Sequence, residues 1–328
     1  MRRKTTKWTI FTVALSLASC SSASHDAAHE AGGADPAPNG DVLETPPREP
    51  RVALVTFDGV RPEEAFGGAG PLPGLEALAA GGVALGRDEP FEASGPSYVS
   101  LPGYAELFTG VGPSRCADND CAAAGAPTLV DRVARAYGDD QAAAIASWEP
   151  VGRVAAAPAT GAFVSAGRSH PRRAPPDAGV AEALARGERS AAWPGHGTYR
   201  PDARTAEVAL AYVRAHAPRL LVVSLGDTDE HAHAGDVAAY HAALRRADAF
   251  VLELTAIYRS KGDPFTVVVT SDHGRADNLR DHGGAFPESR RSWMVSGGTR
   301  PLALPAAPGG ARLRDVAPAV LRALGLAP

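Results

Sequence analysis

Short apolar runs alternate along this chain with longer segments of helical periodicity, and no other feature constrains the fold as strongly. The runs 51–57, 220–225 and 265–270 each have the length and composition of a strand that is buried on both faces. Segments 202–216 and 237–259 carry apolar residues at helical spacing. Because strands that alternate with helices favour a parallel sheet covered on both sides, we predict an α/β fold, a three-layer sandwich with a mostly parallel sheet and helices on both faces.

The rest of the chain from residue 50 onward follows the same alternation, with one exception. Further helices are predicted at 72–80, 128–137 and 315–324 and from about residue 100, and further strands at 142–147 and 293–296. The exception is segment 150–200, which is rich in Ala, Pro, Arg and Gly and which we expect to form loops with little regular structure.

The first residues resemble an export signal. Basic residues precede an apolar run that ends in Leu17-Ala-Ser-Cys20, an order similar to a bacterial lipobox. We expect residues 1–19 to be a lipoprotein signal peptide and a lipid on Cys20 to anchor the exported protein to the membrane of the cell envelope, on its periplasmic side or at the surface. A plain secretory signal with a chance cysteine is the alternative. Residues 20–49 almost lack large apolar side chains and are expected to form a flexible tether, which leaves 50–328 as one folded domain.

Composition and charge exclude several classes of protein. The chain has 328 residues, 45% hydrophobic and 21% charged, as in ordinary globular domains. Its formal net charge of −4 speaks against binding to a nucleic-acid duplex, because such proteins neutralise several phosphates with clustered Lys and Arg. Three cysteines are too few for a disulfide-dense scaffold. Cys116 and Cys121 flank only four residues, and in an exported protein we expect them to form a small loop disulfide rather than remain free thiols.

Potential metal ligands gather in four segments, three of which follow predicted strands. These segments are Asp58, the run from Asp227 to His233, the pair Asp272 and His273, and His282. Open α/β sheets bind ligands outside the carboxyl ends of their strands, so these side chains are expected to meet. Carboxylates and imidazoles without thiolates suit Zn²⁺ best, with Mn²⁺ as the alternative. The number of such groups is enough for two divalent ions.

A serine near residue 100 is a candidate nucleophile. A helix that begins near Ser100 would hold Pro102 in its first turn, where proline is tolerated. A hydroxyl there lies at the positive end of the helix dipole, where a phosphate is also favoured. Metal coordination would lower the pKa of that hydroxyl. Ser97 is the second candidate, and a simple N-cap role for Ser100 is the alternative.

Taken in order, these segments resemble the alkaline phosphatase superfamily, most closely its phosphodiesterase/nucleotide pyrophosphatase and phosphoglycerate- or phosphopentomutase-like branches. The motifs span about residues 51–326 and are Val-Thr-Phe-Asp58-Gly, Pro-Gly-Leu-Glu-Ala-Leu, Ser100-x-Pro-x-x-x-x-Leu-x-Thr-Gly, Asp-Thr-Asp229-Glu-His-Ala-His233-Ala-Gly, Thr-Ser-Asp272-His273-Gly, His282-Gly and Asp315-Val-Ala-Pro-Ala-Val-Leu-Arg-Ala-Leu-Gly. Each motif is weak alone, but together and in this order they are specific.

The resemblance implies a role for each ligand. One ion would be held by Asp58, Asp272 and His273 and touched by Ser100, and the other by Asp229, His233 and His282. Ser100 would attack the substrate and form a phosphoserine intermediate. Water would then release phosphate in a hydrolase, whereas a hydroxyl would accept the phosphoryl group in a mutase or phosphotransferase.

The ligand pair in the second segment is open to two assignments. Asp227 and His231 have the same i, i+4 spacing as Asp229 and His233, so either pair could share a helical face. We favour Asp229 and His233 because Ala-Gly follows His233, which resembles the family's His-x-Gly. Asp227 would then accept a hydrogen bond from a ligand imidazole, and His231 would lie at the site wall or the surface.

The sequence also departs from the family pattern. We expect the diesterase branch to have a phosphate-binding asparagine three residues after the nucleophile, but Gly103 stands there, so that contact is missing or comes from elsewhere. Tyr104 stands where the sulfatase motif has arginine, which speaks against a sulfatase. Arg275, Asn278 and Tyr104 are either substrate contacts or ordinary polar residues of the nearby loops.

The sequence therefore predicts an exported, metal-dependent phosphoric ester hydrolase that uses a serine nucleophile and a small-molecule phosphate ester as its substrate. An envelope phosphotransferase or mutase of the same superfamily and a catalytically silent metal-binding homologue are the alternatives.

Overall fold

A computed structural model describes residues 48–191, 197–304 and 309–328 of the chain. The predicted signal peptide, the lipidated Cys20 and nearly all of the predicted tether lie outside these residues. Within them, no helix combines the length and the apolar character needed to cross a membrane.

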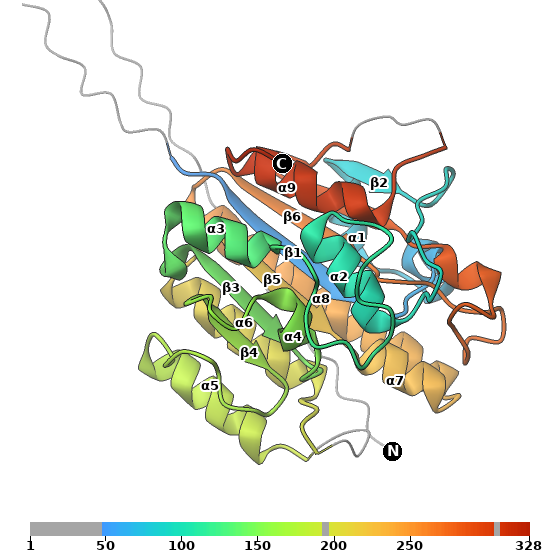
Figure 1. Ribbon diagram of the computed structural model, residues 1–328, viewed down its shortest axis with the longest axis horizontal. Helices are drawn as coiled ribbons and strands as arrows, with labels where there is room; N and C mark the ends of the chain where they lie inside the picture. Colours follow the sequence, from blue (N-terminus) through green and yellow to red (C-terminus); the bar gives the residue numbers. More distant parts are fainter. Residues whose placement is uncertain (1–47, 192–196, 305–308) are drawn as a thin grey trace, which may run out of the picture. The chain divides into compact units, whose positions relative to one another are not determined.

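A seven-stranded sheet forms the middle layer, in the order β2-β7-β6-β1-β5-β3-β4 (Figure 1). The strands are β1 (Arg51–Phe57), β2 (Val83–Leu85), β3 (Ala142–Ala146), β4 (Phe163–Ala166), β5 (Leu220–Leu225), β6 (Phe265–Thr270) and β7 (Met294–Gly298). Strand β7 runs antiparallel to both of its neighbours, and the other pairings are parallel. The predicted mostly parallel sheet is confirmed.

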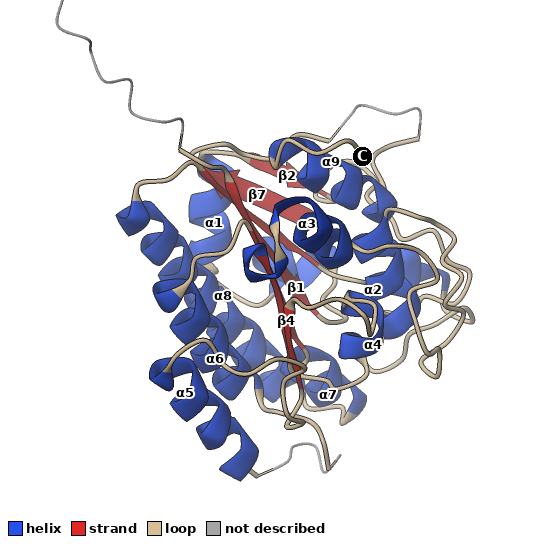
Figure 2. Ribbon diagram, turned by 60° about the vertical axis from the view of Figure 1, so that its left-hand side comes forward, coloured by secondary structure: helices blue, strands red, loops and turns tan. Residues whose placement is uncertain are grey.

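Helices cover both faces of the sheet, and Figure 2 shows the strands between the two helical layers. One face carries α1 (Pro73–Ala80), α5 (Ala178–Arg189), α6 (Asp202–Ala215) and α8 (Val237–Lys261), and the other carries α2 (Ser100–Thr109), α3 (Leu129–Tyr137), α4 (Val151–Ala155) and α9 (Val316–Ala323). The short helix α7 (Asp227–His233) directly follows β5. Each layer has its own apolar core because alternate residues of the buried strands face opposite sides, as Ala53 and Leu54 do. The predicted three-layer α/β sandwich is therefore confirmed.

The expectation that segment 150–200 lacks regular structure is wrong. It contains α4, the edge strand β4 and α5. Asp177 is the N-cap of α5, where its side chain accepts a hydrogen bond from the Val180 backbone N–H, and the helix buries Val180, Ala183 and Leu184. Alanine-rich faces give little contrast between apolar and polar positions, which hides helices of this kind in the sequence.

The topology brings three acid-bearing strand ends together. Strands β6, β1 and β5 are neighbours in the centre of the sheet and run parallel, with Phe57 paired to Leu225 and Thr56 to Thr270. The residues that follow these strands therefore leave the sheet at the same edge.

Candidate metal centre

The first group of ligands comes from the ends of β1 and β6. Asp58 directly follows β1. Ser271 directly follows β6, and Asp272 and His273 are the next two residues. The imidazole Nε2 of His273 lies 3.6 Å from Asp58 Oδ1 and 3.4 Å from Asp272 Oδ2. All three side chains are buried, and their ligand atoms lie within 4.8 Å of one another. We call this group the inner cluster.

The second group, which we call the outer cluster, comes from α7 and from the loop after β6. Asp229 and His233 are one helical turn apart on α7, with 3.2 Å between Asp229 Oδ2 and His233 Nε2. His282 Nε2 lies 3.0 Å from His233 Nε2 and 3.8 Å from Asp229 Oδ1. The other ring nitrogen of His282 lies 3.1 Å from the Tyr98 carbonyl oxygen, which fixes the ring if Nδ1 carries the proton. The outer cluster is more exposed than the inner one.

Asp227 and His231, the alternative ligand pair from the run 227–233, lie apart from the outer cluster. The carboxylate of Asp227 accepts hydrogen bonds from the Tyr199 hydroxyl at 3.0 Å and from the Asp202 backbone N–H at 3.2 Å. These described hydrogen bonds of Asp227 involve no imidazole of the two clusters, so a role for Asp227 in orienting a ligand imidazole stays a prediction. His231 lies half-buried on α7, outside both groups of potential ligands found among the described residues.

Ser100 lies against the inner cluster. It is the first residue of α2 and is buried, and its Oγ lies 3.4 Å from Asp58 Oδ1 and 3.4 Å from His273 Nε2. The N-cap position belongs to Val99, so the alternative of a simple cap role for Ser100 is wrong. The second candidate, Ser97, donates its hydroxyl proton to the Ala117 carbonyl oxygen at 2.6 Å.

The inner cluster buries two acids close together, and burial outweighs the favourable charge of Arg275 near Asp58. Burial, reinforced by the charge of Asp272, raises the pKa of Asp58 well above its ordinary value, although the Tyr104 hydroxyl donates to its Oδ2 at 2.9 Å. Burial also raises the pKa of Asp272, whose Oδ2 has no hydrogen-bond partner. Two buried carboxylates, an imidazole and a hydroxyl fit a divalent cation, which would supply the missing positive charge.

The imidazoles of the outer cluster are held neutral. Burial and the nearby His273 and Arg275 lower the pKa of His282 to about 2, and burial lowers the pKa of His233. Neutral imidazole is the form that binds a metal ion, so this group also fits a divalent cation.

The polar residues left open by the sequence have structural partners. Arg275 is fully buried, pairs with Asp229 and donates to the carbonyl oxygens of Gly59 and Arg280 at 3.0 and 2.9 Å. Asn278 donates to Asp281 at 2.8 Å within an exposed loop. Arg275, Asn278 and Tyr104 therefore bond to other parts of the protein, and none of them lines the cavity described in the next paragraph.

A cavity of about 430 Å³ opens beside both clusters. Its lining consists of Asp58, Ser100, Asn119, Trp148, Tyr199, Gly226, Asp229, Glu230, His233 and His282. Sequence reasoning missed Asn119 and Tyr199, whereas Glu230 belongs to the run from Asp227 to His233 that it identified. Gly226 permits the wall to close, because a Cβ there would lie 2.8 Å from the Tyr199 hydroxyl. The cysteines that flank Asn119 were the one sequence signal that its loop has a fixed shape.

Position 103 cannot carry the asparagine that the family pattern led us to expect. A Cβ on Gly103 would lie 2.5 Å from the backbone oxygen of Asp272, closer than side chains approach. The asparagine of the cavity comes instead from the loop between Cys116 and Cys121, which the structure joins in the predicted disulfide.

Comparisons with known proteins agree with this geometry. The family model of the Metalloenzyme superfamily matches residues 178–286, a segment that contains the whole outer cluster. No curated protein matches the sequence. The fold is similar to that of the 2-O GAG sulfatase BT1596, with a TM-score of 0.57 and 13% identity over 86% of this chain and 71% of that one.

Two further structures share the fold. One is the alkaline phosphatase from the Antarctic bacterium TAB5, with a TM-score of 0.52 and 12% identity over 86% of this chain and 99% of that chain. The other is the PsFucS1 sulfatase from Pseudoalteromonas sp., with a TM-score of 0.54 and 15% identity over 85% and 68% of the two chains. The family match and the shared fold confirm the resemblance of this chain to the alkaline phosphatase superfamily, which consists of metal-dependent phosphoryl and sulfuryl hydrolases and mutases.

Proposed function

We propose that this protein is a metal-dependent phosphoric ester hydrolase with Ser100 as its nucleophile. The observation that carries the proposal is the position of the Ser100 hydroxyl, 3.4 Å from both Asp58 and His273, at the start of α2 and in the lining of the cavity. A hydroxyl placed there can attack a phosphorus atom that the cavity admits.

Each cluster would hold one divalent ion, with Zn²⁺ the best match to the donor set and Mn²⁺ the alternative. When bound, such ions lower the pKa of a coordinated hydroxyl and stabilise negative charge on the transferred group. Asp58 accepts the hydrogen bond of the Ser100 hydroxyl and would orient it. The attack would break the bond between phosphorus and the ester oxygen, release the alcohol after that oxygen takes up a proton, and leave a phosphoserine at Ser100, which water would then hydrolyse.

The remaining cavity residues would bind and orient the substrate. The Oδ1 of Asn119 accepts the Leu101 backbone N–H at 2.9 Å, which leaves Nδ2 to donate to a phosphoryl oxygen. This donor would take the place of the contact that Gly103 cannot make. Trp148 and Tyr199 offer an aromatic wall for the leaving group.

Charge favours esters with a single negative charge. No lysine or arginine occurs among the described residues that line the cavity. The four carboxylates of the site, Asp58, Asp229, Asp272 and Glu230, would balance two divalent ions, and Arg275, which pairs with Asp229, adds one positive charge that suits one negative charge on the substrate. A phosphodiester carries one negative charge and a phosphomonoester up to two, so we expect diesters to be the better substrates.

A substrate panel tests the proposal. Metal-loaded protein should hydrolyse bis(p-nitrophenyl) phosphate faster than p-nitrophenyl phosphate, and the Ser100→Ala variant should lose both activities. Sulfate monoesters also carry one charge, and the folds of two sulfatases are similar, so p-nitrophenyl sulfate belongs in the panel. Hydrolysis of the sulfate alone would reassign the substrate class, and no hydrolysis of any ester would refute the proposal. Product analysis with an added alcohol separates hydrolysis from phosphoryl transfer.

We also propose that the protein is exported and anchored by a lipid on Cys20. The support is the Leu-Ala-Ser-Cys order after a basic and apolar leader. Radioactive palmitate should label the wild-type protein in bacterial cells, and the Cys20→Ser variant should remain unlabelled. Labelling of both would refute the lipid site.

A further inference from the structure

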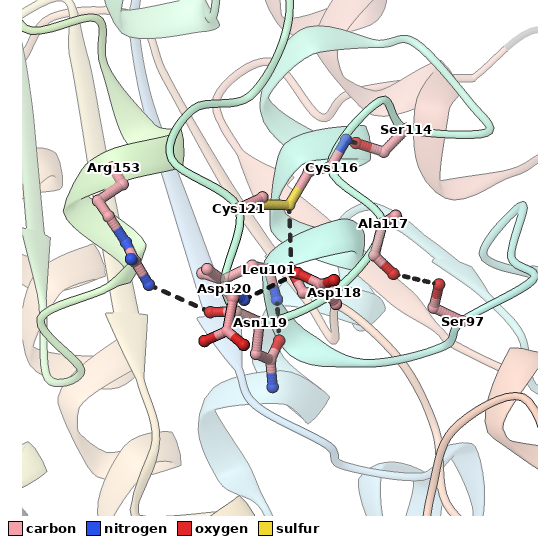
Figure 3. The surroundings of a disulfide bond; sticks show 10 residues. All are labelled: Ser97, Leu101, Ser114, Cys116, Ala117, Asp118, Asn119, Asp120, Cys121 and Arg153. Atoms are coloured by element: carbon pink, nitrogen blue, oxygen red, sulfur yellow. Dashed lines mark hydrogen bonds between the residues drawn. A yellow bond between two sulfur atoms is a disulfide. The ribbon is translucent and has the colours of Figure 1, made fainter.

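The disulfide loop packs against the beginning of α2 at Leu101 (Figure 3). Asn119 is at the centre of this loop, and two contacts fix it from opposite sides. Its side-chain Oδ1 accepts the Leu101 backbone N–H at 2.9 Å, and its backbone oxygen accepts a hydrogen bond from Arg153 Nη2 at 3.1 Å. Leu101 is the residue after Ser100, so the loop, the nucleophile and helix α4, which carries Arg153, form one connected unit.

These contacts decide which end of the amide faces the cavity. The Leu101 N–H can only donate, so it must meet the oxygen of the Asn119 amide and not its NH₂ group. Asn119 lines the cavity and is half-buried, and no described hydrogen bond occupies its Nδ2. The amide is therefore oriented as a donor toward the cavity.

A donor of this kind is useful only if it is held in place before the reaction. Hydrogen-bond donors that stabilise developing charge are effective because they need no reorganisation, and an error of about 1 Å can cost about 100-fold in rate. Asn119 lies on a surface loop, and its neighbours Asp118 and Asp120 are exposed. The covalent bond between Cys116 and Cys121 closes this loop and removes most of its alternative conformations.

We infer that the Cys116–Cys121 disulfide and Arg153 are positioning groups for the reaction, and that they act by holding the Asn119 amide against α2 with its Nδ2 toward the cavity. This inference rests on the proposed function, in which Asn119 donates to the phosphoryl group. It assigns a catalytic consequence to a bond that lies outside both metal-ligand clusters.

A double-mutant cycle tests whether the disulfide acts through Asn119. In the metal-loaded full chain, Asn119→Ala should lower kcat for diester hydrolysis about 100-fold with little change in KM. The paired change Cys116→Ser with Cys121→Ser should lower kcat about 10- to 30-fold. Asn119→Ala added to the paired change should cost only about 3- to 10-fold more, because most of the contribution of the amide is already lost. Additive losses would overturn the inference.

Hydrogen exchange gives a readout that does not depend on activity. Loss of the disulfide should speed exchange of the Leu101 amide by about 10-fold or more, since its acceptor, Asn119 Oδ1, is no longer fixed. Arg153→Met should also speed exchange of the Leu101 amide. It replaces the cysteine variant in this test if that variant does not fold. Asp120→Ala is the matched control, because its side chain is exposed and its backbone N–H, which donates to Asp118, is retained.

The two readouts separate the inference from the proposed function. Unchanged exchange at Leu101 in both the cysteine variant and Arg153→Met would overturn the inference even if the protein hydrolyses diesters. If the wild-type protein hydrolyses no ester, the proposed function fails, whereas exchange at Leu101 still decides whether the disulfide holds Asn119.

Discussion

A single methyl group at position 103 should separate Ser100, the proposed nucleophile, from Asp58 and His273. Gly103 lies in the first turn of α2, three residues after Ser100, and contacts the backbone of Asp272. A Cβ there would lie 2.5 Å from the Asp272 oxygen, whereas ordinary contacts begin at 3.4 Å, so one of the two segments must move by about 0.9 Å. Either movement changes the distance between Ser100 and the inner cluster.

The expected size of the effect follows from that displacement. A shift of about 1 Å at reacting groups can cost about 100-fold in rate, and overpacking of a buried contact costs about 1–3 kcal/mol of stability. Gly103→Ala should therefore lower kcat/KM for diester hydrolysis about 100-fold while the protein remains folded. Gly81→Ala is the control, because nothing lies within 4 Å of a Cβ at that exposed position and its φ is negative.

The assay combines steady-state diester hydrolysis, urea unfolding and elemental analysis of bound metal. Urea unfolding identifies a variant that is inactive only because it is unfolded, and metal analysis shows whether the displaced Asp272 still binds. If Gly103→Ala is folded and hydrolyses the diester as fast as Gly81→Ala does, the contact between α2 and the inner cluster does not set the activity. The reasoning that this contact holds Ser100 at its distance from the inner cluster would then be refuted.

Three further outcomes are expected. Ser100→Ala should lower kcat by at least about 1,000-fold and Ser97→Ala by less than about 3-fold in the same assay, and the reverse order would move the nucleophile to Ser97. In a titration monitored by calorimetry, His233→Ala should bind one divalent ion instead of two, whereas His231→Ala should still bind both. Loss of an ion in His231→Ala would favour Asp227 and His231 as the ligand pair. Burial raises the pKa of Asp58 and Asp272, so these acids contribute stability to the metal-free protein while they are protonated. That contribution is lost as pH rises through the raised pKa values, and bound metal offsets the loss. The difference in Tm between metal-loaded and chelator-treated protein should therefore widen as pH rises from the ordinary carboxyl range toward neutrality, and a constant or narrowing difference would contradict this reasoning. His282 stays neutral in the fold over that range, since its pKa is lowered to about 2, and does not reverse the trend.

The sequence predicted those elements whose periodicity is strong. Strands β5 and β6 match their predicted ranges at both ends, and α8 extends two residues past its predicted end. Continuous runs of Val, Leu and Phe can only be buried, so their boundaries fall where polar residues begin. Helix α3 begins after Thr128, whose side chain forms a capping box with Asp131, a signal that is visible in the sequence.

The elements that were missed lack such contrast. Strand β4 has four residues and lies at the sheet edge, and α5 is built largely from alanine, glycine and arginine. Strand β2 has three residues and is defined by its pairing with β7. Their positions depend on contacts with distant segments, which a single sequence does not display.

The same distinction explains which parts of the candidate site could be predicted. The inner cluster depends on strand ends, and parallel neighbours must deliver their C-terminal residues to one edge, so Asp58 and Asp272 could be placed together from the sequence. The substrate side of the cavity depends on loops. Asn119 reaches it through a disulfide and a contact with Arg153, and Tyr199 through a hydrogen bond to Asp227.

The arrangement also separates two tasks within the site. The ligands of the inner cluster are buried and held by the sheet, so their spacing is as rigid as the central strands. The outer cluster is partly exposed and shares the cavity lining with residues from loops. Changes in those loops can alter the shape and charge of the cavity without moving the strand ends that lie beside Ser100, the proposed nucleophile. Substrate preference in this protein should therefore be determined by Asn119, Trp148 and Tyr199, and the chemistry by the ends of β1 and β6 and the start of α2.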